Sequence, residues 1–145
     1  MNSAFHSWAF ATPSDTDVCA RQGQLDPAVD LARKENIHLG LSTPSAEVWL
    51  LLHFRDRPGL LLDSKAAEHA VGTAWGRDYD KSEQTFVKLW PALKPRIPTA
   101  VARAAEVRKY HLHAGTPFPQ NPSTELDLLV LALNVSVQPQ LRIIH

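Results

Sequence analysis

Apolar residues recur every three or four positions along most of the chain, which predicts a mainly helical protein. The segments with this spacing are 26–36, 46–54, 64–76, 82–93, 98–114 and 122–133. The segment 46–54 is apolar on almost every side, so we expect it to be the most buried helix. A 145-residue domain with so little predicted sheet looks incomplete.

Residues with known preferences for helix ends mark the boundaries of these segments. The predicted starts are Asp26 followed by Pro27, Ser45, Asp63 or Ser64, Ser82, Pro98, and Asn121 followed by Pro122. The predicted ends are Asn36, Gly76 and Gly115. Pro91 is expected to break the last turn of its helix, because proline has no backbone N–H to donate.

The clearest strand signal lies in the first third of the chain. Ile37, Leu39 and Leu41 alternate with more polar or small residues, and this period of two predicts a strand. A second short strand is weakly indicated over residues 6–12, and the tail after residue 134 alternates weakly, as a strand or a disordered segment would.

Composition and charge fit a single domain spanning residues 1–145. The 15 basic and 15 acidic residues cancel, so no global field draws the chain to nucleic acid or to a membrane surface. Cys19 is the only cysteine, which excludes an intrachain disulfide. There is no apolar run of about 20 residues and no secretory signal. We therefore expect a cytoplasmic protein.

Three carboxylates are candidate metal ligands. Asp15 and Asp17 are two residues apart, so their side chains converge in an extended segment or a tight turn, as in many Mg²⁺ sites. The alternative is a solvated loop, because aspartate also favours turns. Glu47 lies in the first turn of a predicted helix, where the helix dipole alone would favour an acid that faces water.

Basic residues gather in the long segment 98–114. Arg103, Arg108 and Lys109 form a broad stripe that could contact phosphate groups or could be an ordinary solvated face. The histidines show no metal-ligand spacing, and His53 is expected to be packed and hydrogen-bonded in its buried helix. No glycine-rich phosphate loop is present.

Three separated motifs resemble the RloB-like family. They are "LDPAVDLARKENIHLGLSTPSAEVWLLLHF" with Trp49 near its end, the Tyr-Asp-Lys element Tyr79–Ser82, and the closing motif Asn121, Pro122, Ser123 and Thr124. They occur in the family's order, and the resemblance runs from about Asp15 to Leu133.

The resemblance implies a branch of the toprim fold, a metal-dependent nuclease-type domain found beside restriction and abortive-infection genes. It implies a helix-rich α/β protein with a small partial parallel sheet and C-terminal helices. Asp15 and Asp17 match the family's Mg²⁺-binding Asp-x-Asp, and Glu47 matches the glutamate before the tryptophan. The implied partners are nucleic acid and an ATPase from the same defence operon.

The chain also departs from the family pattern. The first strand, whose glutamate would act as general acid or base, has no counterpart, and Ser45 and Ala46 replace cysteine and phenylalanine. The chain thus resembles the C-terminal two thirds of such a protein. In this interpretation it is either a truncated gene product or a half whose partner is encoded elsewhere. Its expected parts are a divergent segment 1–14, a toprim-like remnant 15–62, a helical part 63–134 and a tail 135–145.

Three functions remain open from the sequence. The first is a component of a phage-defence or restriction-associated system that binds Mg²⁺ and nucleic acid. The second is a catalytically inactive interaction module, such as a homodimer that pairs the exposed edge of the strand near residues 37–43. The third is an inert remnant. A shared metal site predicts that the Glu47 carboxylate lies within about 4–8 Å of Asp15 and Asp17, and Trp49 is expected to be buried.

Overall fold

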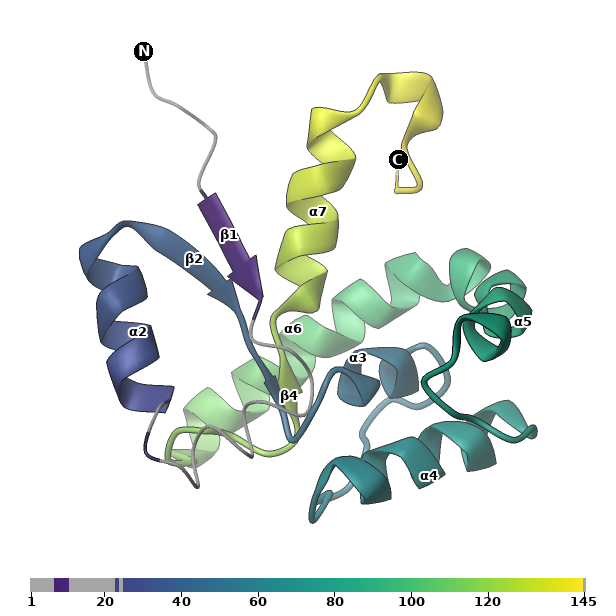
Figure 1. Ribbon diagram of the computed structural model, residues 1–145, viewed down its shortest axis with the longest axis horizontal. Helices are drawn as coiled ribbons and strands as arrows, with labels where there is room; N and C mark the ends of the chain where they lie inside the picture. Colours follow the sequence, from purple (N-terminus) through teal and green to yellow (C-terminus); the bar gives the residue numbers. More distant parts are fainter. Residues whose placement is uncertain (1–6, 11–22, 24, 145) are drawn as a thin grey trace.

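Helices make up most of the protein, and two pairs of short strands lie among them (Figure 1). The computed structural model describes residues 7–10, 23 and 25–144. Its helices are α2 (Leu25–Lys34), α3 (Glu47–Leu52), α4 (Ser64–Trp75), α5 (Glu83–Leu93), α6 (Ile97–Ala114) and α7 (Leu126–Ser136), with 3₁₀ turns at Lys94–Arg96 and Pro139–Leu141. The strands are β1 (Ser7–Phe10), β2 (Ile37–Gly40), β3 (Ser42–Thr43) and β4 (Ser123–Thr124). The predicted helix-rich α/β class is confirmed.

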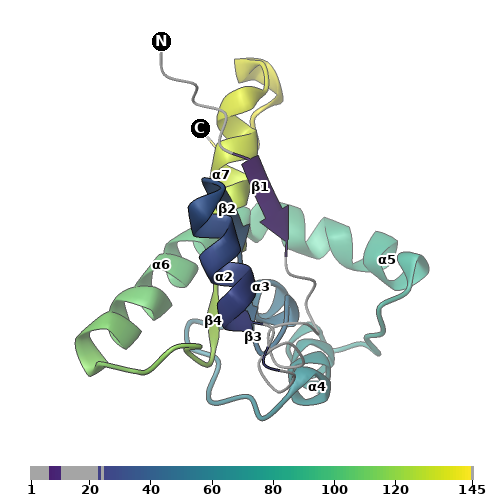
Figure 2. The same cartoon turned by 60° about the vertical axis from the view of Figure 1, so that its left-hand side comes forward.

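The strands form two separate pairs within the described residues. β1 runs parallel to β2, with Ser7 opposite Ile37, and α2 lies along β2 (Figure 2). β3 runs antiparallel to β4, with Ser42 opposite Thr124. β4 comes from late in the chain and lies against both α3 and α6. Its pairing with β3 therefore holds the segment before α3 next to α6.

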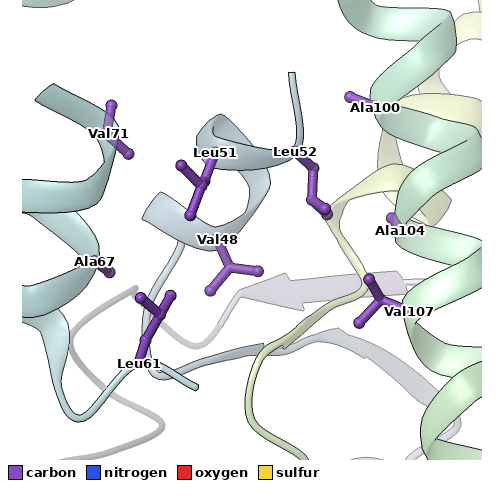
Figure 3. Close-up of a cluster of buried hydrophobic side chains, with 9 residues drawn as sticks. All are labelled: Val48, Leu51, Leu52, Leu61, Ala67, Val71, Ala100, Ala104 and Val107. Carbon is purple, nitrogen blue, oxygen red and sulfur yellow. The ribbon is translucent and has the colours of Figure 1, made fainter. Parts of the chain in front are cut away.

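The core surrounds α3. Figure 3 shows Leu51 of α3 on the side of α4, Leu52 on the side of α6, and Val48 near Leu61. The cluster is completed by Leu61, Ala67, Val71, Ala100, Ala104 and Val107. Alanines on α4 and α6 let both helices approach α3 closely, because a methyl side chain takes little space. α3 contributes the largest share of fully buried leucine and valine, as its all-round apolar pattern predicts.

Several predicted helix boundaries are confirmed. The Asp63 carboxylate accepts a hydrogen bond from the backbone N–H of Ala66 at 2.8 Å, and the Ser82 hydroxyl accepts one from Thr85 at 3.2 Å. Asn36, Gly76 and Gly115 end their helices with φ angles of 56°, 80° and 66°. These left-handed conformations suit glycine and asparagine.

Two predictions about helix ends are wrong. Ser45 does not cap α3, since no side chain caps that helix and the Ser45 hydroxyl bonds to Glu47 instead. Pro91 does not break α5, which continues to Leu93. Pro91 has no N–H to donate to the carbonyl of Val87, four residues earlier. Val87 is 63% exposed, so water can bind this carbonyl instead.

The prediction that Asn121 caps a helix is also wrong. α7 begins at Leu126, and the intervening residues form β4. The Asn121 side chain instead accepts from the backbone N–H of Leu61 at 3.3 Å and donates to the Leu61 carbonyl at 2.6 Å. The tail continues α7 to Ser136 and then turns, and no strand forms over residues 134–144. Along the described part of the chain, none of the helices has the length and apolar character to cross a membrane.

His53 is packed at the end of α3, as expected. Its side chain is buried, its Nδ1 lies 2.9 Å from the carbonyl oxygen of Trp49, and its ring meets the Trp49 ring edge-on at 4.7 Å. Burial lowers the pKa of His53, against the two backbone hydrogen bonds that raise it, and Arg96 and Arg103 lower it further. The imidazole therefore stays neutral at pH values where a free histidine is protonated.

This lowered pKa predicts that the protein loses stability in mild acid. An unfolded histidine takes up a proton near about pH 6.5, whereas folded His53 does so only at lower pH, so the unfolded chain binds more protons in between. The free energy of unfolding should fall between about pH 7.5 and about pH 5.5, by at most about 1.4 kcal/mol per pH unit from this residue. Urea denaturation at several pH values measures it. His53→Gln should flatten the dependence, and the exposed-site control His113→Gln should not; equal slopes in both variants would contradict the prediction.

Candidate functional site

The carboxylate of Glu47 is buried at the start of α3. Glu47 is only 3% exposed. Its Oε2 accepts a hydrogen bond from the Ser45 hydroxyl at 2.5 Å, and its Oε1 accepts one from the Tyr79 hydroxyl at 3.1 Å. The interpretation of Glu47 as a helix acid facing water is therefore wrong: a buried carboxylate needs partners of this kind, and here they come from two segments.

Lys81 supplies the countercharge for this carboxylate. Its Nζ lies 3.6 Å from Glu47 Oε1 and 3.1 Å from Glu68 Oε1, so one ammonium group serves two acids. Partial burial opposes protonation of this amine, but the hydrogen bond to Glu68 and the negative charge of Glu47 outweigh it and raise the pKa of Lys81. Glu47 is thus both buried and electrostatically paired.

Tyr79 is held as a hydrogen-bond donor. Burial, together with the adjacent Glu47 carboxylate, raises the pKa of the Tyr79 phenol far above its ordinary value. The hydroxyl group therefore keeps its proton and donates it to Glu47. Gly72 permits this arrangement, since a Cβ there would lie 3.2 Å from the carbonyl oxygen of Arg77 and 3.6 Å from Tyr79.

A cavity of about 280 Å³ opens beside these groups. One wall consists of α3 residues, including Glu47 and Trp49, and the other consists of the segment 79–82 and Phe86. Trp49, expected to be buried, is only partly buried: it packs against the core and lines this cavity. The Tyr-Asp-Lys element and the motif that contains Glu47 and Trp49, more than 25 residues apart in the sequence, therefore build one site.

The turn at Tyr79–Ser82 explains how this element holds its shape. The Asp80 carboxylate accepts from the backbone N–H of Ser82 at 2.8 Å, and the Ser82 hydroxyl in turn caps α5. Asp80 therefore fixes the turn that presents Tyr79 and Lys81. Only its resemblance to the family indicates this element from the sequence, because nothing local identifies Glu47 as its partner.

The two candidate aspartates, Asp15 and Asp17, lie outside the described residues. Their predicted distance of about 4–8 Å from Glu47 therefore stays a prediction. Within residues 7–10, 23 and 25–144, no three histidine, cysteine, aspartate or glutamate side chains gather closely enough to hold a metal ion. Of the three candidate metal ligands, Glu47 is the one that lies among the described residues.

The three basic candidates differ in what they contact. Arg103 donates to the carbonyl of Leu52 at 3.0 Å and pairs with Asp56 at 2.8 Å. Lys109, six residues further along α6, is exposed. The internal contacts of Arg103 give it a role in joining α6 to the end of α3, whereas the charge of Lys109 faces solvent.

Arg108 forms the strongest of these internal contacts. Its NH1 and NH2 donate to the two carboxylate oxygens of Asp127 at 2.6 and 2.8 Å, and NH1 also donates to the carbonyl of Thr124 at 2.6 Å. Asp127 is 1% exposed. This two-pronged pair ties α6 to β4 and α7.

The closing motif has a structural role in the same region. The Thr124 hydroxyl lies 2.6 Å from the Ser42 hydroxyl and accepts from the backbone N–H of Leu126 at 3.2 Å. Ser123 pairs with Thr43 across the two strands, and Asn121 holds Leu61 as described above. The motif thus connects β3, α7 and the segment that leads into α4.

Comparison with known proteins identifies the family. The family model described as RloB-like protein matches residues 13–133, which includes both segments of the Glu47 site and the closing motif. Searches among curated proteins and among solved structures found no match. The match covers most of the chain, and this protein therefore belongs to the RloB-like family.

Proposed function

We propose that this protein is a toprim-derived component of a phage-defence or restriction-associated system, acting on nucleic acid with Mg²⁺ held by Asp15, Asp17 and Glu47. The observation that carries the proposal is the Glu47 site: a buried carboxylate, in the best-matched family motif, that lines a cavity. Buried charges with built-in partners occur often at functional sites. An ATPase encoded nearby would be the expected partner.

The Glu47 carboxylate retains room for a hard cation. An ionised carboxylate offers about four acceptor positions. Among the described residues, Ser45 uses one on Oε2, and Tyr79 and Lys81 face Oε1, which leaves one position on Oε2 for a cation. Mg²⁺ prefers carboxylate oxygen and would supply the positive charge that Lys81 now provides. The residues present therefore fit one metal-ligand position.

Three side chains support the Glu47 carboxylate at this site. Ser45 and Tyr79 fix the orientation of the Glu47 carboxylate, which is the role that outer hydrogen-bond partners play for metal ligands. Lys81 supplies a countercharge for the carboxylate. A bound divalent ion would supply electrostatic stabilisation of phosphate oxygens.

Calorimetric titration with MgCl₂ and MnCl₂ tests the proposal. The native chain should bind at millimolar metal or below, and Glu47→Gln should weaken binding by about 10-fold or more, because substitutions even of a ligand's supporting groups cost this much. Glu68→Gln is the matched control, since Glu68 shares Lys81 but does not line the cavity beside Glu47. Metal affinity equal in the native chain and Glu47→Gln would exclude Glu47 as a ligand.

A second candidate function, a catalytically inactive interaction module, is favoured by a different surface. Large apolar side chains are exposed along α7 and the segment after it: Leu128, Leu133, Val135, Val137, Leu141 and Ile143. α7 projects from the body formed by α3, α4 and α6 (Figure 1). Exposed apolar surface of this extent marks many protein contacts. No metal response, together with self-association in light scattering, would favour this function over the first.

A further inference from the structure

A second cavity, of about 640 Å³, lies between α6 and the segment 56–60 that follows α3. Asn121 and Pro122 close another side of it. Its volume falls in the range of about 300–1,000 Å³ that is usual for small-molecule sites. It shares no lining residue with the cavity beside Glu47.

Hydrogen bonds hold the walls of this cavity in place. Asn121 binds both the N–H and the carbonyl of Leu61, which fixes the end of the segment 56–60. Arg103 pairs with Asp56 at the start of that segment at 2.8 Å. The cavity is therefore preformed, and a ligand would not have to order its walls.

One wall presents an aromatic ring to solvent. Tyr110 is 59% exposed, and the guanidinium carbon of Arg57 lies 6.0 Å from the centre of its ring. Among the described residues, Arg57 makes no salt bridge. An exposed ring beside a cavity offers a platform on which a planar aromatic group can stack, on the ring face that Arg57 does not cover. The guanidinium, which makes a cation–π contact with the same ring, offers N–H donors for an anionic group attached to it.

Glu106 adds a selective acceptor to the same face of α6. It precedes Tyr110 by four residues, so the two side chains lie one turn apart on one side of the helix, and both line the cavity. An ionised carboxylate accepts hydrogen bonds and donates none. A planar ligand that satisfies it must present donors along one edge. Among the nucleobases, guanine carries two adjacent donors, N1–H and the N2 amino group.

We propose that this cavity binds a single guanine base that carries a phosphate. Tyr110 stacks on the base, Glu106 accepts from its two donors, and Arg57 contacts the phosphate. This inference deepens the proposed function and rests on it for the link to nucleic acid. The source of the base is either a free nucleotide or an unpaired position in a single strand, and both share the chemistry that these three side chains recognise.

An NMR titration of the full chain tests the inference. The ligands are GMP, AMP, and short single-stranded oligonucleotides with and without one guanine. GMP should shift the amide signals of residues 56–60 and 106–110 and should bind more tightly than AMP. Tyr110→Ala should weaken GMP binding by about 10-fold or more, as expected for loss of a stacking platform. Tyr110→Phe should retain binding, because the ring remains. Glu106→Gln should reduce the preference for GMP over AMP, and the control Glu83→Gln, exposed on α5, should not.

The outcomes separate the two sources and the two proposals. Tighter binding of the guanine-containing strand than of GMP assigns the cavity to single strands, and equal or weaker binding assigns it to nucleotides. No shift with either ligand at millimolar concentration, or binding unchanged by Tyr110→Ala, would overturn the inference. Glu47→Gln should leave GMP binding intact, and Tyr110→Ala should leave the Mg²⁺ response intact, so each proposal can fail without the other.

Discussion

Replacement of Arg108 by methionine is expected to lower the free energy of unfolding by about 3–5 kcal/mol. The Asp127 carboxylate, 1% exposed, receives both of its short hydrogen bonds from this guanidinium, at 2.6 and 2.8 Å. Without Arg108 the carboxylate would lose this countercharge while remaining buried, and the carbonyl of Thr124 would lose this donor as well. Urea denaturation of the native and variant chains measures the difference.

Companion variants distinguish loss of the charge pair from loss of packing. Arg108→Lys keeps the charge but not the two-pronged geometry, so it should fall between the native chain and Arg108→Met. The double variant Arg108→Met with Asp127→Leu should recover most of the loss, because apolar residues can replace a buried ion pair. Lys109→Met, an exposed neighbour, should stay within about 0.5 kcal/mol of native. An Arg108→Met chain as stable as Lys109→Met would contradict the structural role of Arg108.

The internal contacts of Arg103 and Arg108 limit their role as phosphate-binding residues. From the sequence, Arg103 and Arg108 were equally good candidates for contacts with phosphate groups, because a stripe of charge on a helix does not reveal its partners. In the structure both guanidinium groups bind inside the fold, whereas Lys109 faces solvent. A nucleic-acid contact by either arginine remains a prediction, and it would have to share the guanidinium with these internal partners.

Elements whose signals are local were predictable from the sequence. The starts of α4 and α5 depend on Asp63 and Ser82, whose side chains bond within three residues, and the end of α6 depends on the conformational freedom of Gly115. Such preferences act before tertiary packing, so a short stretch of sequence contains all the required information. The apolar pattern of 46–54 likewise predicted its burial, because a helix without a polar face must be covered.

Errors arose where a distant residue competed for a side chain with a local preference. Asn121 has the chemistry of a helix cap, but it binds the backbone of Leu61, 60 residues away. Glu47 has the position of a first-turn acid that would face water. It instead binds the Tyr79 hydroxyl and the Lys81 ammonium group, both more than 30 residues away in the sequence. Side-chain preferences cannot identify a partner that only the tertiary fold brings close. Resemblance to the family supplied the Tyr-Asp-Lys element without showing what it contacts.

The second large expected effect concerns the packing that places Glu47. Leu51→Ala should lower the free energy of unfolding by about 2–5 kcal/mol, the usual range for a buried leucine. Leu51 is fully buried and lies between α3 and α4, next to Val48 and Val71 (Figure 3). The space that its removal would leave lies between two packed helices, α3 and α4, and closing that space would require a whole helix to shift, so the cost should not be small.

Urea denaturation again provides the measurement, with Leu62→Ala as the matched control. Leu62 is 82% exposed, so the same truncation there should change stability by no more than about 0.5 kcal/mol. Glu47 lies on α3 four residues before Leu51, so loosening of this helix should also weaken the Tyr79–Glu47 hydrogen bond. The NMR signals of segment 79–82 should therefore change in Leu51→Ala but not in Leu62→Ala. A loss below about 1 kcal/mol in Leu51→Ala, with unchanged signals, would show that α3 is not held between α4 and α6 in the way that positions the buried carboxylate.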